Sequence, residues 1–319
     1  MKYCFIINPA SGKPETKVDL EYKIRAAASE KELDVTVLYT QKAGDATDLI
    51  IHFAKENEGE DIRFYACGGD GTLCEAVNGV MAIPDRERIS LGIVPVGTGN
   101  DFVRSFEKKE LFGDIEAQLD ARETVIDLMR CNDLYSVNMI NIGFDCQVVV
   151  KTDVYKKKKF IPSKLAYICG LIVTLIKKPG VDMKLTADGE EKCDREFLLT
   201  TFAKGNFCGG GFNSNPDASL CDGKINALLV KNISRSRFLR LVGSYKSGTH
   251  LTEKNEKILY SQKASEYVLD FGKKTNVCID GEIKSTEKIH ISCIPDALRI
   301  LIPAGSAYAR AKTRETVVV

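Results

Sequence analysis

A short stretch in the first third of the chain has the residue types that phosphate chemistry needs. Residues 66–73 read ACGGDGTL, in which three glycines surround Asp70 and a helical pattern follows at once. Glycine lets the backbone approach an anion closely, and a helix N-terminus offers free N–H groups and a positive dipole end. Asp70 would repel a bare phosphate, so this interpretation requires Mg²⁺ beside it. The alternative is a tight strand-to-helix turn in which Asp70 caps the helix.

Two further turns have a similar composition. Residues 8–13 read NPASGK, and residues 95–101 read PVGTGND, which supplies Thr98, Asn100 and Asp101 at the start of another helical segment. Neither is the GxxxxGK[ST] loop, which excludes the P-loop fold, and the absence of GxGxxG weakens a nicotinamide dehydrogenase interpretation. Each turn alone is also compatible with an ordinary capped turn. Their joint occurrence favours a phosphate site.

Acidic residues recur in two later turns. Asp280 and Glu282 stand in DGE after the strand-like segment TNVCI, where the simplest interpretation is a hairpin tip with solvated acids. Residues 205–225 form a glycine-rich stretch that carries Asp217 and Asp222. This stretch is either an irregular surface loop or a site in which carboxylate and backbone oxygens hold a hard cation.

The elements of the first third must position these turns. Strand-like runs at residues 3–7, 35–39, 62–67 and 89–96 alternate with helical patterns at 17–31, 46–57 and after Leu73. This alternation predicts a parallel sheet covered by helices. In such sheets the chemistry lies beyond the carboxyl ends of the strands, where all three turns fall.

The alternation of strand-like and helical segments stops at about Tyr135. Turns rich in Gly, Asn, Asp and Pro separate short strand-like pieces, which predicts an antiparallel sandwich. Two helical patterns interrupt these pieces, at residues 163–178 and 235–247. The expected strands are residues 136–142, 197–204, 225–230, 267–271, 276–279, 289–294 and 298–302.

Composition narrows the class of protein. The 319 residues make two domains the expectation, and a net charge of +1 gives no electrostatic case for nucleic acid. The eleven cysteines include no CxxC spacing, which is typical of free thiols in a reducing cytosol. The first residues show no signal-peptide pattern, and the longest apolar run, residues 165–176, is too short to span a bilayer. The three histidines are scattered, without a triad or metal pattern.

Taken in order, NPASGK, GGDGTL, PVGTGNDF, NIGFD, GGGF…PDA…DG and DGE resemble the soluble bacterial diacylglycerol kinase and lipid kinase family. Its catalytic domain is shared with sphingosine and ceramide kinases, and the resemblance runs from Asn8 to about Pro303. It implies an α/β nucleotide-binding domain at residues 1–133 with a parallel sheet, similar to NAD kinase and phosphofructokinase. An all-β sandwich domain for the lipid substrate would follow at 134–303, and residues 304–319 would return to the first domain.

The resemblance also assigns site residues. Glu282 matches the proton acceptor, and Asp70, Asp101 and Asp127 match acids near the catalytic Mg²⁺. A structural Mg²⁺ would bind Ser219, Asp222 and the carbonyl of Lys224. Departures are small: Cys74 and Cys146 stand where asparagine and alanine are common. The implied ATP contacts are Asn8, Pro9, Ala10, Ser11, Gly12, Thr40, Gly68, Gly69, Asp70, Gly71, Thr72, Leu73, Cys74 and Thr98.

The resemblance implies transfer of the γ-phosphoryl group of MgATP to a lipid hydroxyl, that of diacylglycerol first. Phosphatidylglycerol and a sphingoid base are alternative acceptors, and NAD kinase and a catalytically silent nucleotide sensor are rival functions. The expected location is the cytoplasm with peripheral membrane contact; the oligomeric state stays open, a homodimer included. In the segment at 155–180, Lys156 to Lys159 are predicted to dock on anionic lipid, whereas the helix itself more simply packs on the sandwich core.

Overall fold

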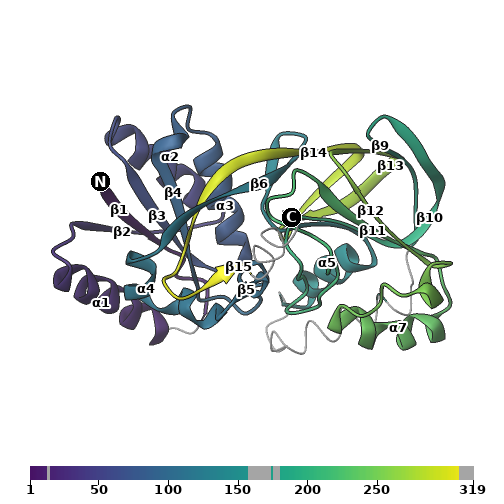
Figure 1. Ribbon diagram of the computed structural model, residues 1–319, viewed down its shortest axis with the longest axis horizontal. Coiled ribbons are helices and arrows are strands. Elements are labelled where there is room, and N and C mark those ends of the chain that lie inside the picture. Colours follow the sequence, from purple (N-terminus) through teal and green to yellow (C-terminus); the bar gives the residue numbers. More distant parts are fainter. Residues whose placement is uncertain (13–14, 157–173, 175–179, 309–319) are drawn as a thin grey trace, which may run out of the picture. The chain divides into compact units, whose positions relative to one another are not determined.

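A computed structural model describes residues 1–308 except 13–14, 157–173 and 175–179 (Figure 1). The chain divides into two compact units. The first unit comprises Met1–Leu128 together with the chain from Pro295, and the second comprises Met129–Ile294. The crossings therefore fall at 128/129 and 294/295, where the sequence predicted 133/134 and 303/304. Both lie inside continuous strands, so no linker composition marks them.

The first unit is built on parallel strands. Strand β1 (Lys2–Ile7) pairs in parallel with β2 (Val35–Tyr39) and with β3 (Ile62–Gly68), which in turn pairs in parallel with β4 (Ile89–Pro95). The last part of β14 (Glu282–Ile302) returns to this sheet, where Ile300 lies beside Leu91 of β4. Strand and helix alternate here as the sequence predicts.

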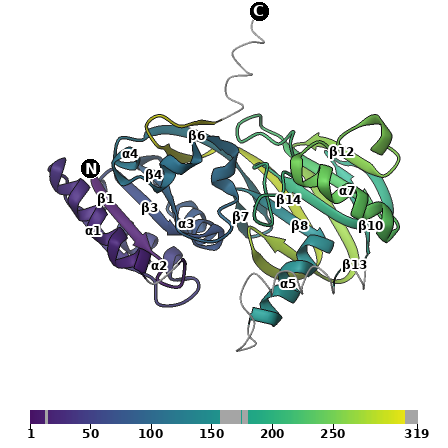
Figure 2. The ribbon, with the colours of Figure 1, turned by 90° about the horizontal axis from the view of Figure 1, so that it is seen from below.

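Helices cover both faces of this sheet because successive strand residues point to opposite sides. The helices α1 (Glu15–Glu30) and α4 (Ile115–Leu119) pack on Phe5, Ile7 and Tyr65, and the rings of Phe5 and Tyr65 stack at 4.2 Å. On the other face, Phe53 of α2 (Asp45–Glu56) meets Phe64 of β3 edge to face, and α3 (Asp70–Met81) lies beside α2 (Figure 2).

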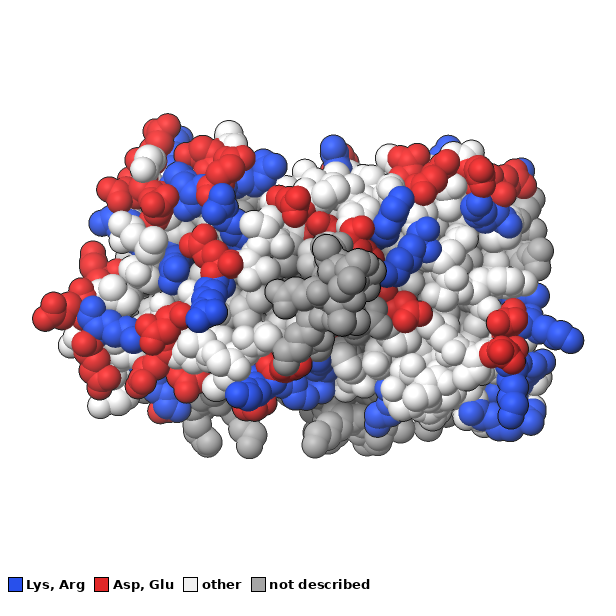
Figure 3. Space-filling view, in the orientation of Figure 1, with Lys and Arg blue, Asp and Glu red and all other residues white. Residues whose placement is uncertain are grey.

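The rest of the first unit consists of short elements. They are three 3₁₀ turns at Arg86–Arg88, Phe102–Ser105 and Lys109–Gly113, strand β5 (Phe106–Glu107), strand β15 (Ala307–Tyr308), which pairs with β5, and the first part of β6 (Arg122–Cys131). On the face of this unit seen in Figure 3, acidic and basic side chains are interspersed. This face therefore carries no single-sign field of the kind that nucleic acid requires.

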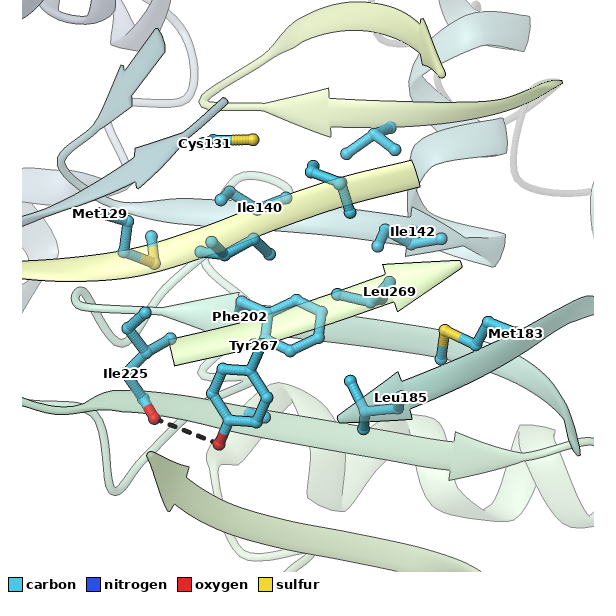
Figure 4. Packing of buried hydrophobic residues seen from close by; sticks show 14 of the residues in the cluster. Met129, Cys131, Ile140, Ile142, Met183, Leu185, Phe202, Ile225, Tyr267 and Leu269 are labelled. Atoms are coloured by element: carbon cyan, nitrogen blue, oxygen red, sulfur yellow. Dashed lines mark hydrogen bonds between the residues drawn. The ribbon is translucent and has the colours of Figure 1, made fainter. Parts of the chain in front are cut away.

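The second unit is antiparallel. Strand β10 (Glu190–Ala203) pairs with β9 (Val181–Ala187), β8 (Met139–Gly143) and β11 (Ile225–Lys231), and β13 (Glu266–Ile279) pairs with both β8 and β9. These pairings close a circuit around one hydrophobic core (Figure 4). In this core the ring of Tyr267 lies 4.9 Å from that of Phe202, and its hydroxyl donates to the carbonyl of Gln262 at 3.1 Å.

Two helices pack outside this circuit. In Figure 1, α5 (Phe144–Lys156) and α7 (Arg235–Ser247) lie below the strands of the second unit. Phe144 and Phe238 bring them together, with ring centroids 4.7 Å apart. Strands β7 (Leu134–Ser136) and β12 (Leu259–Ala264) and the 3₁₀ turn at Glu253–Asn255 complete the unit.

Several expected strand ends are wrong. The pieces at 267–271 and 276–279 are one strand, β13, whose register shifts between Asp270 and Thr275. Those at 289–294 and 298–302 are likewise both part of β14, which passes through Pro295 and a left-handed Asp296 at φ 50°. The turn residues in these stretches mark irregularities within strands. The expected helix at 163–178 lies outside the described residues, apart from Thr174.

Candidate functional site

The three polar turns of the first unit contact one another at the carboxyl ends of β1, β3 and β4. The side-chain amide of Asn8 donates to the hydroxyl of Thr72 at 2.9 Å. The backbone N–H groups of Val96 and Gly97 donate to the carbonyl of Gly68 at 2.9 and 3.2 Å. This is the arrangement that parallel strand order predicts, because the ends of adjacent parallel strands share one edge.

Glycine is required at two of these contacts by close backbone approach. A Cβ atom on Gly97 would lie 2.5 Å from the Cα of Gly69, and one on Gly12 would lie 2.6 Å from the carbonyl oxygen of Val96. Gly12 also has a φ of +73°, which favours glycine. The turns therefore pack backbone to backbone.

Asp70 connects two of the turns through hydrogen bonds. It is the first residue of α3, and the N-cap is Gly69, so the alternative in which Asp70 caps the helix is wrong. Its Oδ1 instead accepts hydrogen bonds from the backbone N–H groups of Asp101 at 2.8 Å and Phe102 at 3.4 Å. Burial raises the pKa of this carboxyl, and the backbone donors oppose that effect. The turn thus holds a partly buried carboxylate that backbone donors fix in place.

A second carboxylate faces the same point. A methyl group on Gly99 would lie 2.7 Å from Oδ2 of Asp70 and 3.8 Å from Oδ2 of Asp101. Asp101 is buried and also pairs with Arg104, whose Nε lies 3.3 Å from its Oδ1. Two carboxylates with an oxygen near one point form a donor set that suits Mg²⁺ carried by a nucleotide, which usually takes one or two protein carboxylates. Asp127 is buried on β6, where its Oδ1 accepts from the N–H of Asp296 at 3.1 Å.

A pocket opens beside these turns, within the first unit. It brings together residues from three segments of the chain, and most of them were expected nucleotide contacts. Gln41, Lys42, Ala43 and Glu75 were not expected. Glu75 follows Thr72 by three residues on the same helix, so helical spacing would have indicated it. The pocket is lined by Asn8, Pro9, Ala10, Ser11, Thr40, Gln41, Lys42, Ala43, Gly69, Gly71, Thr72 and Glu75.

Other expected contacts lie around this pocket rather than in its lining. Gly12 and Gly68 belong to the backbone contacts beneath it. Leu73 and Cys74 are each only 4% exposed, so their side chains serve the helix interface, and a nucleotide would meet them through the backbone. Thr98 lies in the turn after β4, next to Gly97.

In the second unit, the DGE turn is a two-residue hairpin rather than a pair of solvated acids. Asp280 and Gly281 have φ angles of 45° and 96°, and Ile279 pairs with Glu282 across them. Asp280 is buried and accepts from the Ser136 hydroxyl at 2.9 Å and from the N–H groups of Val137 and Met139 at 2.8 and 2.7 Å. Burial raises its pKa to about 6, against those donors.

Glu282 is the partly exposed acid of this hairpin. Its side chain is 38% exposed, and its Oε2 lies 3.3 Å from Nζ of Lys284. The hairpin fixes its backbone because Asp280 anchors the turn to residues 136–139. Glu282 therefore has the exposure that a proton acceptor for an incoming hydroxyl needs.

Two of the three expected ligands of a structural metal, Asp222 and Lys224, lie close together in the second unit, but a lysine occupies their oxygens. Nζ of Lys204 lies 3.0 Å from Oδ1 of Asp222 and 2.8 Å from the carbonyl oxygen of Lys224. Ser219 accepts from the N–H of Cys221 at 3.5 Å. Among the described residues, no group of three or more His, Cys, Asp or Glu side chains is placed to hold a metal ion.

An apolar cavity of about 150 Å³ lies in the second unit between α5, α7 and the glycine loop. That is room for several methylene groups, since an engineered cavity of this size takes up benzene. At its wall, the carboxyl of Asp145 accepts from the hydroxyl of Tyr245 at 3.1 Å. Burial raises the pKa of Asp145 to about 6. The lining is Asn141, Phe144, Asp145, Val148, Val149, Cys208, Gly209, Phe212, Phe238, Leu239, Val242 and Tyr245.

The basic and apolar segment at 155–180 mostly lies outside the described residues, and that is also true of the predicted docking lysines 157–159. Among the helices that the structure describes, none has the length and hydropathy needed to cross a membrane.

Family models match both parts of the chain. Residues 2–131 match the diacylglycerol kinase catalytic domain, and residues 138–302 match the YegS C-terminal NAD kinase beta sandwich-like domain. Proteins named diacylglycerol kinase align over most of the chain. The protein of Staphylococcus epidermidis (strain ATCC 35984 / RP62A) is 30% identical, with 87% of this chain and 84% of that protein covered. That of Bacillus subtilis (strain 168) is 28% identical, with 87% and 88% covered.

Solved structures share the fold. A crystal structure of a diacylglycerol kinase from Bacillus anthracis str. Sterne superimposes with a TM-score of 0.69 at 21% identity, over 95% of this chain and 97% of that one. Another structure from the same organism reaches 0.75 at 23% identity, over 96% and 98%. Together with the family models and the relatives, this likeness shows an N-terminal catalytic domain followed by a β-sandwich domain. The chain belongs to the diacylglycerol kinase family.

Proposed function

We propose that the protein is an ATP-dependent lipid kinase that transfers the γ-phosphoryl group to the free hydroxyl of diacylglycerol, giving phosphatidic acid. The observation that carries this proposal is the pocket of the first unit, which opens beside the sheet edge where three glycine turns and the acid Asp70 contact one another. The choice of diacylglycerol as the acceptor follows the relatives, which are named diacylglycerol kinase. Phosphoryl transfer asks mainly for positioning and charge neutralisation, and this site offers both without a covalent nucleophile.

In this proposal the phosphates of ATP lie against the turn amides and the N-terminus of α3. Lys42 is the one described cation among the residues that line the pocket, and it would neutralise phosphate charge. The nucleotide contacts carried over from the resemblance are Asn8, Pro9, Ala10, Ser11, Gly12, Thr40, Gly68, Gly69, Asp70, Gly71, Thr72, Leu73, Cys74 and Thr98.

The donor set of the first unit fits Mg²⁺ that arrives with ATP. We assign Asp70 and Asp101 to that ion because one oxygen of each carboxylate lies within 4 Å of the position that a Cβ on Gly99 would take. Asp127 remains a proposed member of the same network, from the resemblance. The ion would neutralise charge on the phosphates when bound; the protein's own part is to hold the two carboxylates in place through backbone donors.

Glu282 is the proposed proton acceptor for the lipid hydroxyl. Its partial exposure and its fixed hairpin support the assignment, because a general base must be reachable by substrate and held in position. The apolar cavity of the second unit offers a place for hydrocarbon from the same substrate. Peripheral membrane contact, a cytoplasmic location and a homodimer also remain proposals, as does the kinship of the first unit with NAD kinase and phosphofructokinase.

A transfer assay with radiolabelled ATP separates the candidate acceptors. Diacylglycerol, phosphatidylglycerol, sphingosine and NAD are offered in turn, the lipids in mixed micelles. We expect label in the chloroform-soluble product with diacylglycerol. Label on NAD alone would make the protein a nucleotide kinase, and no transfer to any acceptor, with ATP bound, would make it a sensor. Transfer to another lipid would keep the reaction class and change the substrate.

A further inference from the structure

A buried lysine stands where the family resemblance implies a metal ion. Lys204 follows the last residue of β10, and its side chain is fully buried, at 0% exposure. The sequence around it, FLLTTFAKG, is that of an apolar strand, in which an ionised ammonium group is tolerated only when it is paired. The pairing partners therefore show what this lysine does.

The ammonium group binds the oxygens that would ligate the ion. Nζ of Lys204 donates to Oδ1 of Asp222 at 3.0 Å and to the carbonyl oxygen of Lys224 at 2.8 Å. The same Oδ1 also accepts from the N–H of Lys224 at 3.2 Å. These contacts close the turn around Gly223, whose φ is +67°. A Mg²⁺ ion would need the same two oxygens at about 2.1 Å.

The second oxygen of Asp222 is occupied in the same way. Nζ of Lys263, on β12, lies 2.7 Å from Oδ2 of Asp222. One carboxylate is thus flanked by two ammonium groups, and the local formal charge is already positive. A dication at this carboxylate would be repelled by both ammonium groups, of which that of Lys204 is fully buried.

We propose that the ammonium group of Lys204 replaces the structural metal ion at Asp222 and Lys224, so that the glycine loop of this protein is held by an internal cation and binds no Mg²⁺ of its own. Strands β10 and β11 are adjacent in the sheet. Lys204 connects the end of β10 to the turn that precedes β11. A contact made by the protein's own lysine is always present, whereas the stabilisation from a bound ion depends on the concentration of free Mg²⁺.

Two measurements on the wild-type protein, both without nucleotide, test the proposal. Thermal unfolding is followed in EDTA and in MgCl₂ at matched ionic strength, and Mn²⁺ binding is titrated by electron paramagnetic resonance. We expect equal melting temperatures and no tight Mn²⁺ site that depends on Asp222. A Mg²⁺-dependent rise in melting temperature or a tight Mn²⁺ site, present in wild type and lost in Asp222→Asn, would overturn it. Binding that Asp222→Asn leaves intact belongs elsewhere and is consistent with the proposal.

A matched pair of variants tests the role of the ammonium group itself. Lys204→Met and Lys263→Met each remove one ammonium partner of Asp222 and keep a similar side-chain length. Because Lys204 is fully buried and Lys263 is 38% exposed, we expect the larger fall in melting temperature from Lys204→Met. An equal or smaller effect would contradict the proposal. If Lys204→Met does not fold, the measurements on the wild-type protein still decide it.

Discussion

At the scale of single residues, Asp280 is a buried carboxyl, Asp70 and Asp145 are partly buried carboxyls, and the partners of the three differ. Backbone N–H groups reach Asp70 and Asp280, whereas Asp145 has the hydroxyl of Tyr245. Burial raises the pKa of all three carboxyls. A carboxylate that accepts several donors has a role in fixing the backbone, so substitution at Asp280 would affect the hairpin first. Asp70 combines such a role with a position between Gly69 and Gly71, which line the pocket.

Asp70→Asn should nearly abolish turnover and leave the fold intact. The amide oxygen can still accept from the N–H of Asp101, so the turn keeps its hydrogen bond, but the charge that would hold Mg²⁺ is lost. Electrostatic groups of this kind contribute about 10²–10³ in kcat. Steady-state kinetics at saturating MgATP and circular dichroism melting check the two parts. A wild-type kcat would refute the assignment of Asp70.

Glu282→Gln should lower kcat with little change in the affinity for ATP. A general base contributes about 10²–10⁴ in rate, and the glutamine keeps the size of the side chain. Lys284→Gln is the matched control, because it removes the neighbour of Glu282 without touching the carboxylate. Should Glu282→Gln weaken only ATP binding, Glu282 would be a positioning residue.

Asp145→Asn should stabilise the protein at neutral pH and above. Burial raises the pKa of this carboxyl to about 6 in the folded protein from its ordinary value of 3.8, so the native state binds the extra proton between these values. Its contribution to stability is present below about pH 4 and is lost as pH rises through about 6. Asparagine cannot ionise, so the variant should gain up to about 3 kcal/mol over wild type by about pH 8.

The measurement is chemical denaturation of both proteins at about pH 4.5 and about pH 8, on either side of the raised pKa. The difference in unfolding free energy should grow between these two values. A constant difference would mean that Asp145 does not titrate in this range in the folded protein.

Residue-scale sequence reasoning found the acids of the turns and missed those whose role depends on packing. Asp145 stands inside the quoted NIGFD motif, but nothing in one sequence shows that Tyr245, a hundred positions later, lies over it. The sequence does mark Lys204 as unusual, because it is a lysine at the end of an apolar strand. The identity of its partners required the fold.

At the scale of elements, the turns of the first unit depend on glycine contacts that cross between them. Gly97→Ala should lower the free energy of unfolding by about 1–3 kcal/mol and weaken ATP binding, because its Cβ would lie 2.5 Å from the Cα of Gly69 and force the turns apart. Gly113→Ala is the control, since its Cβ would meet nothing within 4 Å. Denaturant melts and ATP titrations of both variants check this. Equal unfolding free energies for the two variants would show that the turns accommodate the extra methyl group without loss of stability.

The helices and strands could be predicted from the sequence where their hydrophobic periodicity matches the type of element that forms. Strand β2 and helix α7 begin and end where the sequence indicates, because each has clear periodicity between turn residues. Strand β9 and the first half of β10 were missed because charged residues interrupt their apolar pattern. Helix α5 was missed because its β-branched residues favour strands and only its packing on β8 and β13 fixes it as a helix.

At the scale of the whole molecule, the first unit is discontinuous in sequence. Strand β14 starts in the second unit and delivers Leu298, Ile300 and Leu301 to the first, where all three are at most 2% exposed. Leu301 belongs to the same core cluster as Phe5 and Tyr65. The first unit is therefore stabilised by residues from the last strand of the sheet, far along the chain from its other strands.

A protein that ends after Ile294 should consequently lose the stability of the first unit, including its ATP pocket, while the second unit keeps its sequence entire. Each buried leucine or isoleucine removed costs about 2–5 kcal/mol, which for three exceeds the stability of many domains. A protein that ends after Pro303 is the control, because it retains all three side chains. ATP binding and limited proteolysis compare the two: we expect residues 1–128 to be digested first in the shorter protein. If both proteins bind ATP equally and resist protease equally, the returning strand is dispensable for the catalytic unit.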